Sequence, residues 1–332
     1  MKAVRLTGPG RVEVTDAPEP GGSGLAIVRA ETMGICGTDL KVVAGTVGVE
    51  FPRTLGHELV GRVLASPDPR LPEGTRVLAD PALACGACSP CRHHRPHLCR
   101  HGGLMGREVD GVFAEYSAID PARLLAVPDA VGQEAAGLLQ VLGTCIHGLR
   151  TVDLVPGDVA LVMGLGVAGQ LMVQLLAAAG MVVVGATRSE HKQALAARHG
   201  ASAVASPGEV AAVLDEVSVG EGPVLVVEAV GTEATLVRSI ELAGEGGDVV
   251  MFGTATNGGQ GLPYFEMYFK ELTLWNPRAA LLDDYARAIE LMAAGTLTVD
   301  EMVSHSVPLE EAPRAFELAE DPASLKVLVT NS

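Results

Sequence analysis

The pattern of hydrophobic and polar positions changes near residue 150. Before it, short apolar-rich runs at 2–6, 12–14, 25–29 and 60–64 are separated by clusters of Gly and Pro. Short runs of this kind, bounded by turn residues, are typical of β-strands. The first 150 residues therefore predict an all-β, barrel-like domain.

After Gly157 the apolar runs become continuous and alternate with helical patterns. Strands that alternate with helices are typical of parallel βαβ units in a doubly wound sheet, so we predict an α/β fold for residues 151–276. The expected strands are 159–163, 182–185, 224–229 and 248–252, with helices at 169–179 and 189–199. Mixed structure follows, with helices near 284–294 and 310–318 and a last strand at 326–329.

Composition and charge narrow the range of partners. The 332 residues are 48% hydrophobic and carry a formal net charge of −16, with no basic stripe. This argues against binding to nucleic acid or to an anionic membrane surface. Residues 159–187 carry no formal charge, but five glycines and two glutamines interrupt them, so we expect buried strands and a helix rather than a membrane span. With no secretory signal at the start, a cytoplasmic location is expected.

Four cysteines give the densest chemical signal. Cys85, Cys88, Cys91 and Cys99 have the spacing C-x2-C-x2-C-x7-C in a loop with Gly and Pro. Four thiolates this close suit a closed, tetrahedral zinc site of structural type. Disulfide pairing is the alternative, but it needs an oxidising compartment. We therefore predict a structural zinc ion that organises this loop.

A glycine motif lies between the first strand and the first helix of the α/β part. It has the form G-x-G-x-x-G, and in this position it predicts a dinucleotide site rather than a turn without a ligand. Gly164 would make the turn, Gly166 would admit a pyrophosphate, and Gly169 would let helix and strand pack closely. The predicted cofactor-binding residues are Gly164, Leu165, Gly166, Val167, Ala168 and Gly169.

Thr187 and Arg188 stand at the end of the second strand, where a site for NAD usually carries Asp or Glu. Thr187 can donate a hydrogen bond, and Arg188 can pair with a 2′-phosphate. This pattern favours NADP over NAD. The alternative is an Arg188 side chain that simply points to solvent.

A second group of metal-ligating residues lies in the first part of the chain. Cys36, Thr38 and Asp39 form one short segment, and His57 and Glu58 follow about twenty residues later. Cys and His are zinc ligands, and a catalytic zinc needs three protein ligands and an exchangeable position. Each residue alone would be ambiguous, but with the cysteine cluster and the glycine motif the set is specific.

At these residues the chain resembles the zinc-containing medium-chain alcohol dehydrogenase family, in particular its polyol and threonine dehydrogenase-like branch. The resemblance extends over essentially the whole chain. It implies a GroES-like β-barrel catalytic domain formed by residues 1–150 and 277–332, and a Rossmann domain over 151–276. It also implies a homodimer or a homotetramer.

The resemblance assigns roles to the metal-ligating group. Cys36 and His57 look like ligands of a catalytic zinc, and Glu58 looks like a ligand or a close carboxylate. Thr38 resembles the hydroxyl that takes the substrate proton, and Asp39 would orient the His57 imidazole.

Two positions depart from the family pattern. Gln140 stands where relatives supply a Cys, Asp or Glu ligand, so the fourth zinc ligand could be Gln140 or water, or the catalytic zinc could be weak or lost. Lys41 stands where relatives often carry a relay His, so the relay could end at Thr38 instead. By the same resemblance, Lys326 would reach the cofactor pyrophosphate.

The implied reaction is the reversible oxidation of a secondary alcohol to a ketone by hydride transfer with NAD(P). A small polyol, sugar or cyclitol-like substrate fits the resemblance. Two alternatives stay open. One is a zinc-free NADPH reductase of activated double bonds, which Gln140 motivates. The other is a catalytically inactive dinucleotide-binding protein, against which the intact Thr38 and Asp39 weigh.

Overall fold

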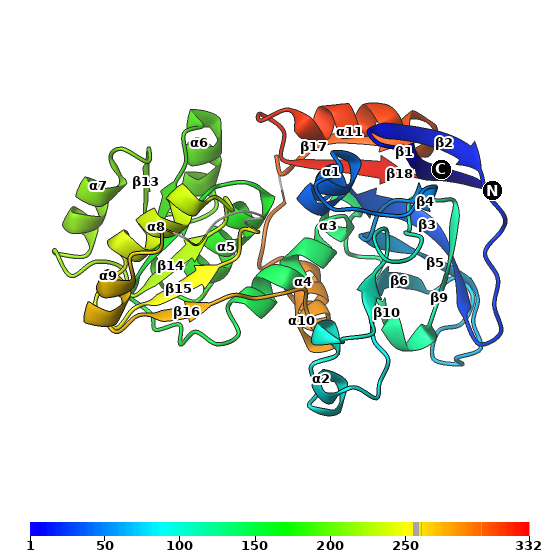
Figure 1. The fold of residues 1–332 in the computed structure, drawn as a ribbon, viewed down its shortest axis with the longest axis horizontal. Coiled ribbons are helices and arrows are strands. Elements are labelled where there is room, and N and C mark those ends of the chain that lie inside the picture. Colours follow the sequence, from blue (N-terminus) through cyan, green and yellow to red (C-terminus); the bar gives the residue numbers. More distant parts are fainter. Residues whose placement is uncertain (255–258, 260, 300, 332) are drawn as a thin grey trace. The chain divides into compact units, whose positions relative to one another are not determined.

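The computed structural model describes residues 1–254, 259, 261–299 and 301–331. Its contacts divide the chain into two compact units, whose ribbons are drawn in Figure 1. The first unit contains Met1–Gly143, Ala279–Gly295 and Val299–Ser332, and the second contains Thr144–Arg278 and Thr296–Thr298. The expected boundary at residue 150 therefore differs from the observed one, which lies inside helix α4 (Leu139–Gly148).

The first unit is built around a seven-stranded sheet of order β10-β6-β5-β3-β18-β17, in which β9 also pairs with β3. Buried side chains such as Met33, Leu59 and Phe113 join this sheet and a second sheet, β2-β1-β4, in one core. The strands are β1 (Lys2–Gly8), β2 (Arg11–Asp16), β3 (Ala26–Gly34), β4 (Arg53–Thr54), β5 (Leu59–Ala65), β6 (Arg76–Ala79), β9 (Tyr116–Ile119), β10 (Leu124–Ala126), β17 (Val303–Pro308) and β18 (Lys326–Thr330).

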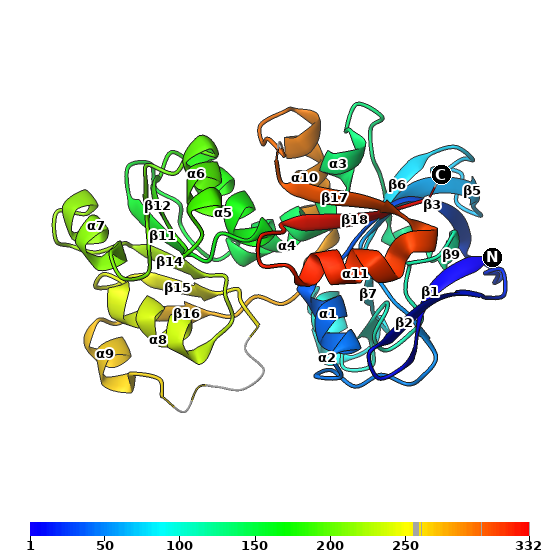
Figure 2. The same cartoon turned by 90° about the horizontal axis from the view of Figure 1, so that it is seen from above.

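The C-terminal strand β18 lies inside this sheet, antiparallel to β3 and parallel to β17. Helix α11 (Ala312–Glu320) packs on β17 and β18, as Figure 2 shows. Strand β18 therefore completes a sheet whose first strand along the chain is β3.

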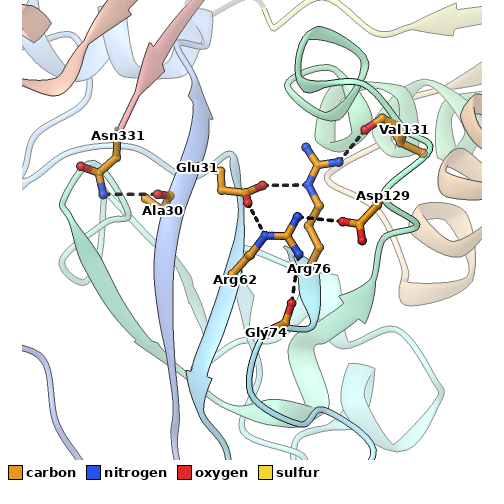
Figure 3. A network of polar contacts seen from close by, with 8 residues as sticks. All are labelled: Ala30, Glu31, Arg62, Gly74, Arg76, Asp129, Val131 and Asn331. Atoms are coloured by element: carbon orange, nitrogen blue, oxygen red, sulfur yellow. Dashed lines mark hydrogen bonds and ion pairs between the residues drawn. The ribbon is translucent and has the colours of Figure 1, made fainter.

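An ionic network ties β3, β5 and β6 together (Figure 3). The two carboxylate oxygens of Glu31 accept from different arginines, Oε1 from Arg62 Nε at 2.6 Å and Oε2 from Arg76 Nε at 2.8 Å. Arg62 also donates to Asp129 at 2.7 Å, and Arg76 donates to the Val131 carbonyl at 2.5 Å. The Arg76 end of the network is buried and the Asp129 end is exposed.

The second unit holds a six-stranded parallel sheet of order β13-β12-β11-β14-β15-β16. This is the strand order of a Rossmann domain. The strands are β11 (Val159–Met163), β12 (Val182–Ala186), β13 (Ala203–Ala205), β14 (Leu225–Glu228), β15 (Asp248–Met251) and β16 (Thr273–Trp275). The helices are α5 (Val167–Ala178), α6 (Glu190–Arg198), α7 (Val210–Val217), α8 (Glu233–Leu242) and α9 (Tyr264–Phe269).

The predicted α/β fold class is confirmed, and the expected strands and helices of the second unit end within two residues of the observed ones. Strands β13 and β16 were not predicted, because three residues are too few to show a periodicity. Among the described residues, no helix is both long enough and apolar enough to cross a bilayer.

Candidate functional site

The four clustered cysteines converge in the loop between β7 (Ala82–Leu83) and β8 (Gly103–Leu104). Their sulfurs all lie within 4.8 Å of one another. The Sγ of Cys88 is 3.4 Å from that of Cys91 and 3.7 Å from that of Cys99. Zn–S bonds of about 2.3 Å at tetrahedral angles separate two sulfurs by roughly 3.8 Å. The cluster therefore fits a structural zinc ion.

Backbone N–H groups favour the thiolate form that zinc binds. The amide of Cys85 donates to the Cys99 sulfur at 3.2 Å, and the amide of Cys88 donates to the Cys85 sulfur at 3.4 Å. Amide hydrogen bonds from Cys91 and Arg100 lower the pKa of Cys88 to about 6. The loop backbone is thus arranged around sulfur ligands.

A second set of donors gathers in the first unit. Ligand atoms of Cys36, His57 and Glu58 all lie within 4.8 Å of one another, and both His57 and Glu58 are buried. The Oε1 atom of Glu58 has no hydrogen-bond partner among the described residues. Buried polar atoms normally have a partner, so a bare carboxylate oxygen beside a thiol and an imidazole fits a bound metal ion.

Asp39 positions two members of this set. It lies in the first turn of helix α1 (Gly37–Val43), where its Oδ2 accepts from the backbone N–H of Cys36 at 2.9 Å. Its Oδ1 lies 3.3 Å from His57 Nδ1, which leaves Nε2 as the ring nitrogen for a metal. Burial lowers the pKa of His57, but the charge and hydrogen bond of Asp39, together with Cys36, outweigh burial and raise it well above its ordinary value.

Lys326 has a different environment from the predicted one. Its buried Nζ donates to Glu58 Oε2 at 2.5 Å and to the Ile35 carbonyl at 3.1 Å. The register of β18 against β3, which pairs Leu328 with Gly34, brings the ammonium to this point. The resemblance implied that the Lys326 ammonium binds the pyrophosphate of the cofactor. In the structure this ammonium pairs with Glu58 instead.

Gln140 forms a contact with Tyr285 that the sequence did not predict. Its Nε2 donates to the hydroxyl of Tyr285, a fully buried residue of α10 (Leu282–Ala293), at 3.4 Å. Burial, then the charges of Asp80 and Glu58, raise the pKa of Tyr285 well above its ordinary value, so the phenol stays neutral. No local motif marks Tyr285. Ligation of zinc by Gln140 stays a prediction.

Thr38 lies in the first turn of α1, two residues after Cys36, and is half-buried. Its hydroxyl has no hydrogen bond within the described part of the chain, so it is available to a substrate. Lys41 follows in the last turn of the same helix. The relay roles of both residues stay predictions.

The glycine motif forms the turn from β11 into α5, in the second unit. Gly164 has φ 93°, and a Cβ at this position would lie 2.6 Å from Val230 Cγ2. A Cβ at Gly169 would lie 1.9 Å from the Gly164 carbonyl oxygen. Gly166, which caps α5, has open space at its Cβ position, as a pyrophosphate at the helix N-terminus requires. The other motif residues are the buried Leu165 and, in the first turn of α5, Val167 and Ala168.

Thr187 and Arg188 follow the end of β12, as predicted. The Thr187 carbonyl accepts from Gln193 Nε2 at 2.7 Å, and the Thr187 amide donates to the Ala205 carbonyl. Arg188 is exposed and makes no hydrogen bond or ion pair with the described residues. Its guanidinium is therefore available to a 2′-phosphate.

Glu228, at the end of β14, supports the glycine turn. Its buried Oε1 accepts from the amides of Val230 and Gly231, each at 2.9 Å, and from Thr235 Oγ1 at 2.8 Å. These bonds fix the loop that places Val230 against Gly164. Periodicity and spacing give no sign of this role, because it depends on a strand that is distant in sequence.

Comparison with known families gives two matches. Residues 22–129 match the alcohol dehydrogenase GroES-like domain, and residues 167–294 match the zinc-binding dehydrogenase domain.

Individual proteins are similar over nearly the full length. L-galactonate-5-dehydrogenase of Escherichia coli K12 is 29% identical over 307 residues, which cover 91% of this chain and 89% of the relative. A zinc-binding dehydrogenase of Sinorhizobium meliloti 1021, crystallised with NADP, is 32% identical with a TM-score of 0.92, over 99% of this chain and 98% of that one. An alcohol dehydrogenase from Thermus sp. ATN1 is 32% identical with a TM-score of 0.91, over 100% of both chains.

Proposed function

This chain belongs to the zinc-containing medium-chain alcohol dehydrogenases, and we propose that it interconverts a polyol, sugar or cyclitol-like secondary alcohol and its ketone, with NADP as the preferred cofactor. One observation carries the zinc chemistry: the donor atoms of Cys36, His57 and Glu58 lie within 4.8 Å of one another. A zinc-free reductase would have no use for a buried carboxylate oxygen without a partner.

In this proposal Cys36 and His57 hold the catalytic zinc, with Glu58 as the third protein ligand. When bound, the zinc ion would supply a Lewis acid for the alcohol oxygen, and the nicotinamide would supply the hydride acceptor. Thr38 takes the proton of the substrate hydroxyl and passes it towards solvent. Asp39 keeps the His57 ring in one orientation and one tautomer.

The proposed preference for NADP rests on the presence of Arg188 and on the lack of an acidic residue beside it. No Asp or Glu stands at Thr187 or Arg188 to hold a free 2′-hydroxyl, and the exposed guanidinium suits a 2′-phosphate. The similar Sinorhizobium protein was crystallised with NADP, which supports the assignment.

The substrate class rests on similarity. The Escherichia coli relative is an L-galactonate-5-dehydrogenase, so the substrate in its name is a sugar acid. A protein that shares its fold and its length is expected to act on a similar polyhydroxylated compound. A cytoplasmic location and assembly as a homodimer or homotetramer remain predictions.

Zinc analysis combined with a turnover assay tests the proposal. The purified protein would be assayed for zinc per chain and for reduction of NADP or NAD by polyols, sugar acids and cyclitols. The informative variant is Cys36→Ser. Its matched control is Cys145→Ser, because the buried Cys145 lies outside both donor sets.

We expect two zinc ions per chain in the wild type and in Cys145→Ser, with turnover in both. Cys36→Ser should retain one zinc, in the cysteine loop, and lose alcohol oxidation. Two zinc ions with cofactor binding but no turnover on any secondary alcohol would contradict the proposed reaction. A wild type with one zinc and full turnover would contradict the role of Cys36.

A further inference from the structure

Two glutamines interrupt the apolar sequence of helix α5, and both are buried. Gln170 is fully buried and directly follows Gly169, the last glycine of the motif, and Gln174 lies one turn further along the helix. A buried amide group costs free energy unless both its nitrogen and its oxygen are hydrogen-bonded. The partners of Gln170 therefore indicate why a polar residue occupies this position.

The side-chain amide of Gln170 has partners at both ends. Its Nε2 donates to the carbonyl of Leu165 at 3.3 Å and to that of Lys192 at 2.9 Å. Its Oε1 lies 2.9 Å from Nδ1 of His199, a buried residue at the C-terminus of α6. The oxygen can only accept, so the His199 ring carries a proton on Nδ1. The three bonds fix the amide in one orientation, and a buried network with every group satisfied holds its elements in one arrangement.

Gln170 thereby connects two parts of the predicted cofactor site. Leu165 lies in the glycine turn, and Lys192 lies in the first turn of α6. Helices α5 and α6 lie side by side in the second unit (Figure 2). The amide of Gln170 joins the turn that is predicted to bind the pyrophosphate to the helix that follows Arg188.

The start of α6 holds the backbone on both sides of Arg188. Ser189 caps the helix, and its hydroxyl accepts from the Lys192 amide at 3.4 Å. On the other side of Arg188, the Thr187 carbonyl accepts from Nε2 of Gln193 at 2.7 Å. Because both neighbours of Arg188 are bonded to α6, a shift of α6 relative to the glycine turn would carry Arg188 with it.

Backbone bonds between strands fix only part of this geometry. The glycine turn is bonded to the Ala186 carbonyl, at the end of β12, at 2.9 Å, and the Thr187 amide is bonded to the Ala205 carbonyl of β13 at 3.1 Å. Arg188 lies beyond the last of these bonds. Its place relative to the glycine turn therefore depends on α6, and the place of α6 depends on Gln170.

NADP has to reach two anchors at once. Its pyrophosphate binds at a helix N-terminus such as that of α5, and its 2′-phosphate pairs with a cation such as Arg188. One ribose joins the two groups, so only a narrow range of distances between the anchors suits the cofactor. When two anchors bind one ligand, the affinity depends on how well they are held in place before binding.

We propose that Gln170 is a positioning residue for cofactor selection, which holds Arg188 at the distance from the glycine turn that NADP spans. This inference rests on the proposed preference for NADP. NAD uses the glycine turn without a 2′-phosphate, and 2′-AMP uses Arg188 without a pyrophosphate. The binding of either ligand should therefore depend little on Gln170.

Calorimetric titration with NADP, NAD and 2′-AMP tests this role without any turnover. Gln170→Leu removes the three hydrogen bonds and keeps a side chain of similar volume. Gln174→Leu is the matched control, because Gln174 is a buried amide of the same helix that bonds instead to the backbone of Thr298, at 2.9 and 2.8 Å. Gln170→Met is a second variant of the same position, and circular dichroism checks that each protein is folded.

We expect Gln170→Leu to bind NADP about tenfold more weakly, because the charged hydrogen bond of Arg188 is partly lost, and to bind NAD and 2′-AMP within about twofold of the wild type. Gln174→Leu should keep all three affinities. Adding Gln170→Leu to Arg188→Ala should weaken NADP binding no further, since the two residues act through one contact.

Three results would overturn the inference. The first is a loss for NADP that NAD or 2′-AMP shares equally, which would show that Gln170 shapes one anchor rather than the distance between the two. The second is an unchanged NADP affinity, and the third is additive losses in the double variant. If Gln170→Leu does not fold, the same results for Gln170→Met decide. A wild type that binds NAD as tightly as NADP would contradict the proposed cofactor itself, and with it this inference.

Discussion

Replacing Glu31 by Gln should destabilise the first unit far more than replacing Asp129 by Asn, although both carboxylates bind the same arginine. Glu31 gives one oxygen to Arg62 and the other to Arg76, whose side chain is 7% exposed. The amide of the Glu31→Gln variant would offer one oxygen and turn an N–H group towards a guanidinium. Asp129, in contrast, is 75% exposed and bonds only to Arg62.

The magnitude follows from the burial of Arg76. Removing one partner of a buried ion pair costs about 3–5 kcal/mol, because the other charge is left buried. Arg76 keeps its bond to the Val131 carbonyl, and Glu31 is 21% exposed, so the lower figure of about 3 kcal/mol applies. With a urea dependence of about 3 kcal/mol per molar, the midpoint for the first unit should fall by about 1 M.

Urea unfolding followed by far-ultraviolet circular dichroism measures this effect. Fluorescence of Trp275 reports on the second unit, so a transition seen by dichroism but not by fluorescence belongs to the first. Asp129→Asn should leave both transitions in place, since an exposed ion pair contributes little. Equal shifts for the two variants, or no shift for Glu31→Gln, would refute the reasoning.

Three further predictions concern charge. Arg188→Ala should weaken NADP binding by roughly ten- to a hundredfold, because it removes one charged hydrogen bond, and it should leave NAD binding unchanged. Calorimetric titration with both cofactors measures the two affinities, and equal losses for NADP and NAD would contradict the assignment. Lys326→Met removes the cation that competes for Glu58, so removal of the catalytic zinc should need about tenfold more chelator. Easier removal of this zinc would show instead that Lys326 supports the site. Burial raises the pKa of Asp80, so its protonated form is favoured by folding and this stabilisation is lost as the pH rises above about 4. Asp80→Asn should therefore raise the urea midpoint at pH 7, with the gain disappearing towards pH 4; a gain that persists there would contradict the role of charge.

The parts that could be predicted from the sequence have local causes. The apolar run 159–163 is short and is followed by glycine, as expected of a buried strand, and the turn after it requires glycine at positions 164 and 169. The cysteine spacing indicated the zinc loop for the same reason, because its ligands lie within fifteen residues of one another. The α/β fold class followed from alternation of these local patterns.

The parts that could not be predicted depend on contacts between distant residues. Glu58 and Lys326 are 268 residues apart, and Gln140 and Tyr285 are 145 apart. No spacing encodes such a pair, since it arises from sheet register and helix packing. Helix α9 was also not predicted, because its six residues are too few to show a helical periodicity.

Strand β18 is synthesised after the whole of the second unit, yet in the sheet it lies between β3 and β17. The second unit is almost contiguous, Thr144–Arg278, and can fold while the rest is still being synthesised. The first unit has to wait for its inner strand, and with it for the ammonium of Lys326 beside Glu58. We therefore expect ribosome-stalled chains that end before Lys326 to bind the dinucleotide but to lack the second zinc, so that this zinc is loaded only after β18 has been synthesised. Stalled chains that already hold both ions would show that the site closes without β18.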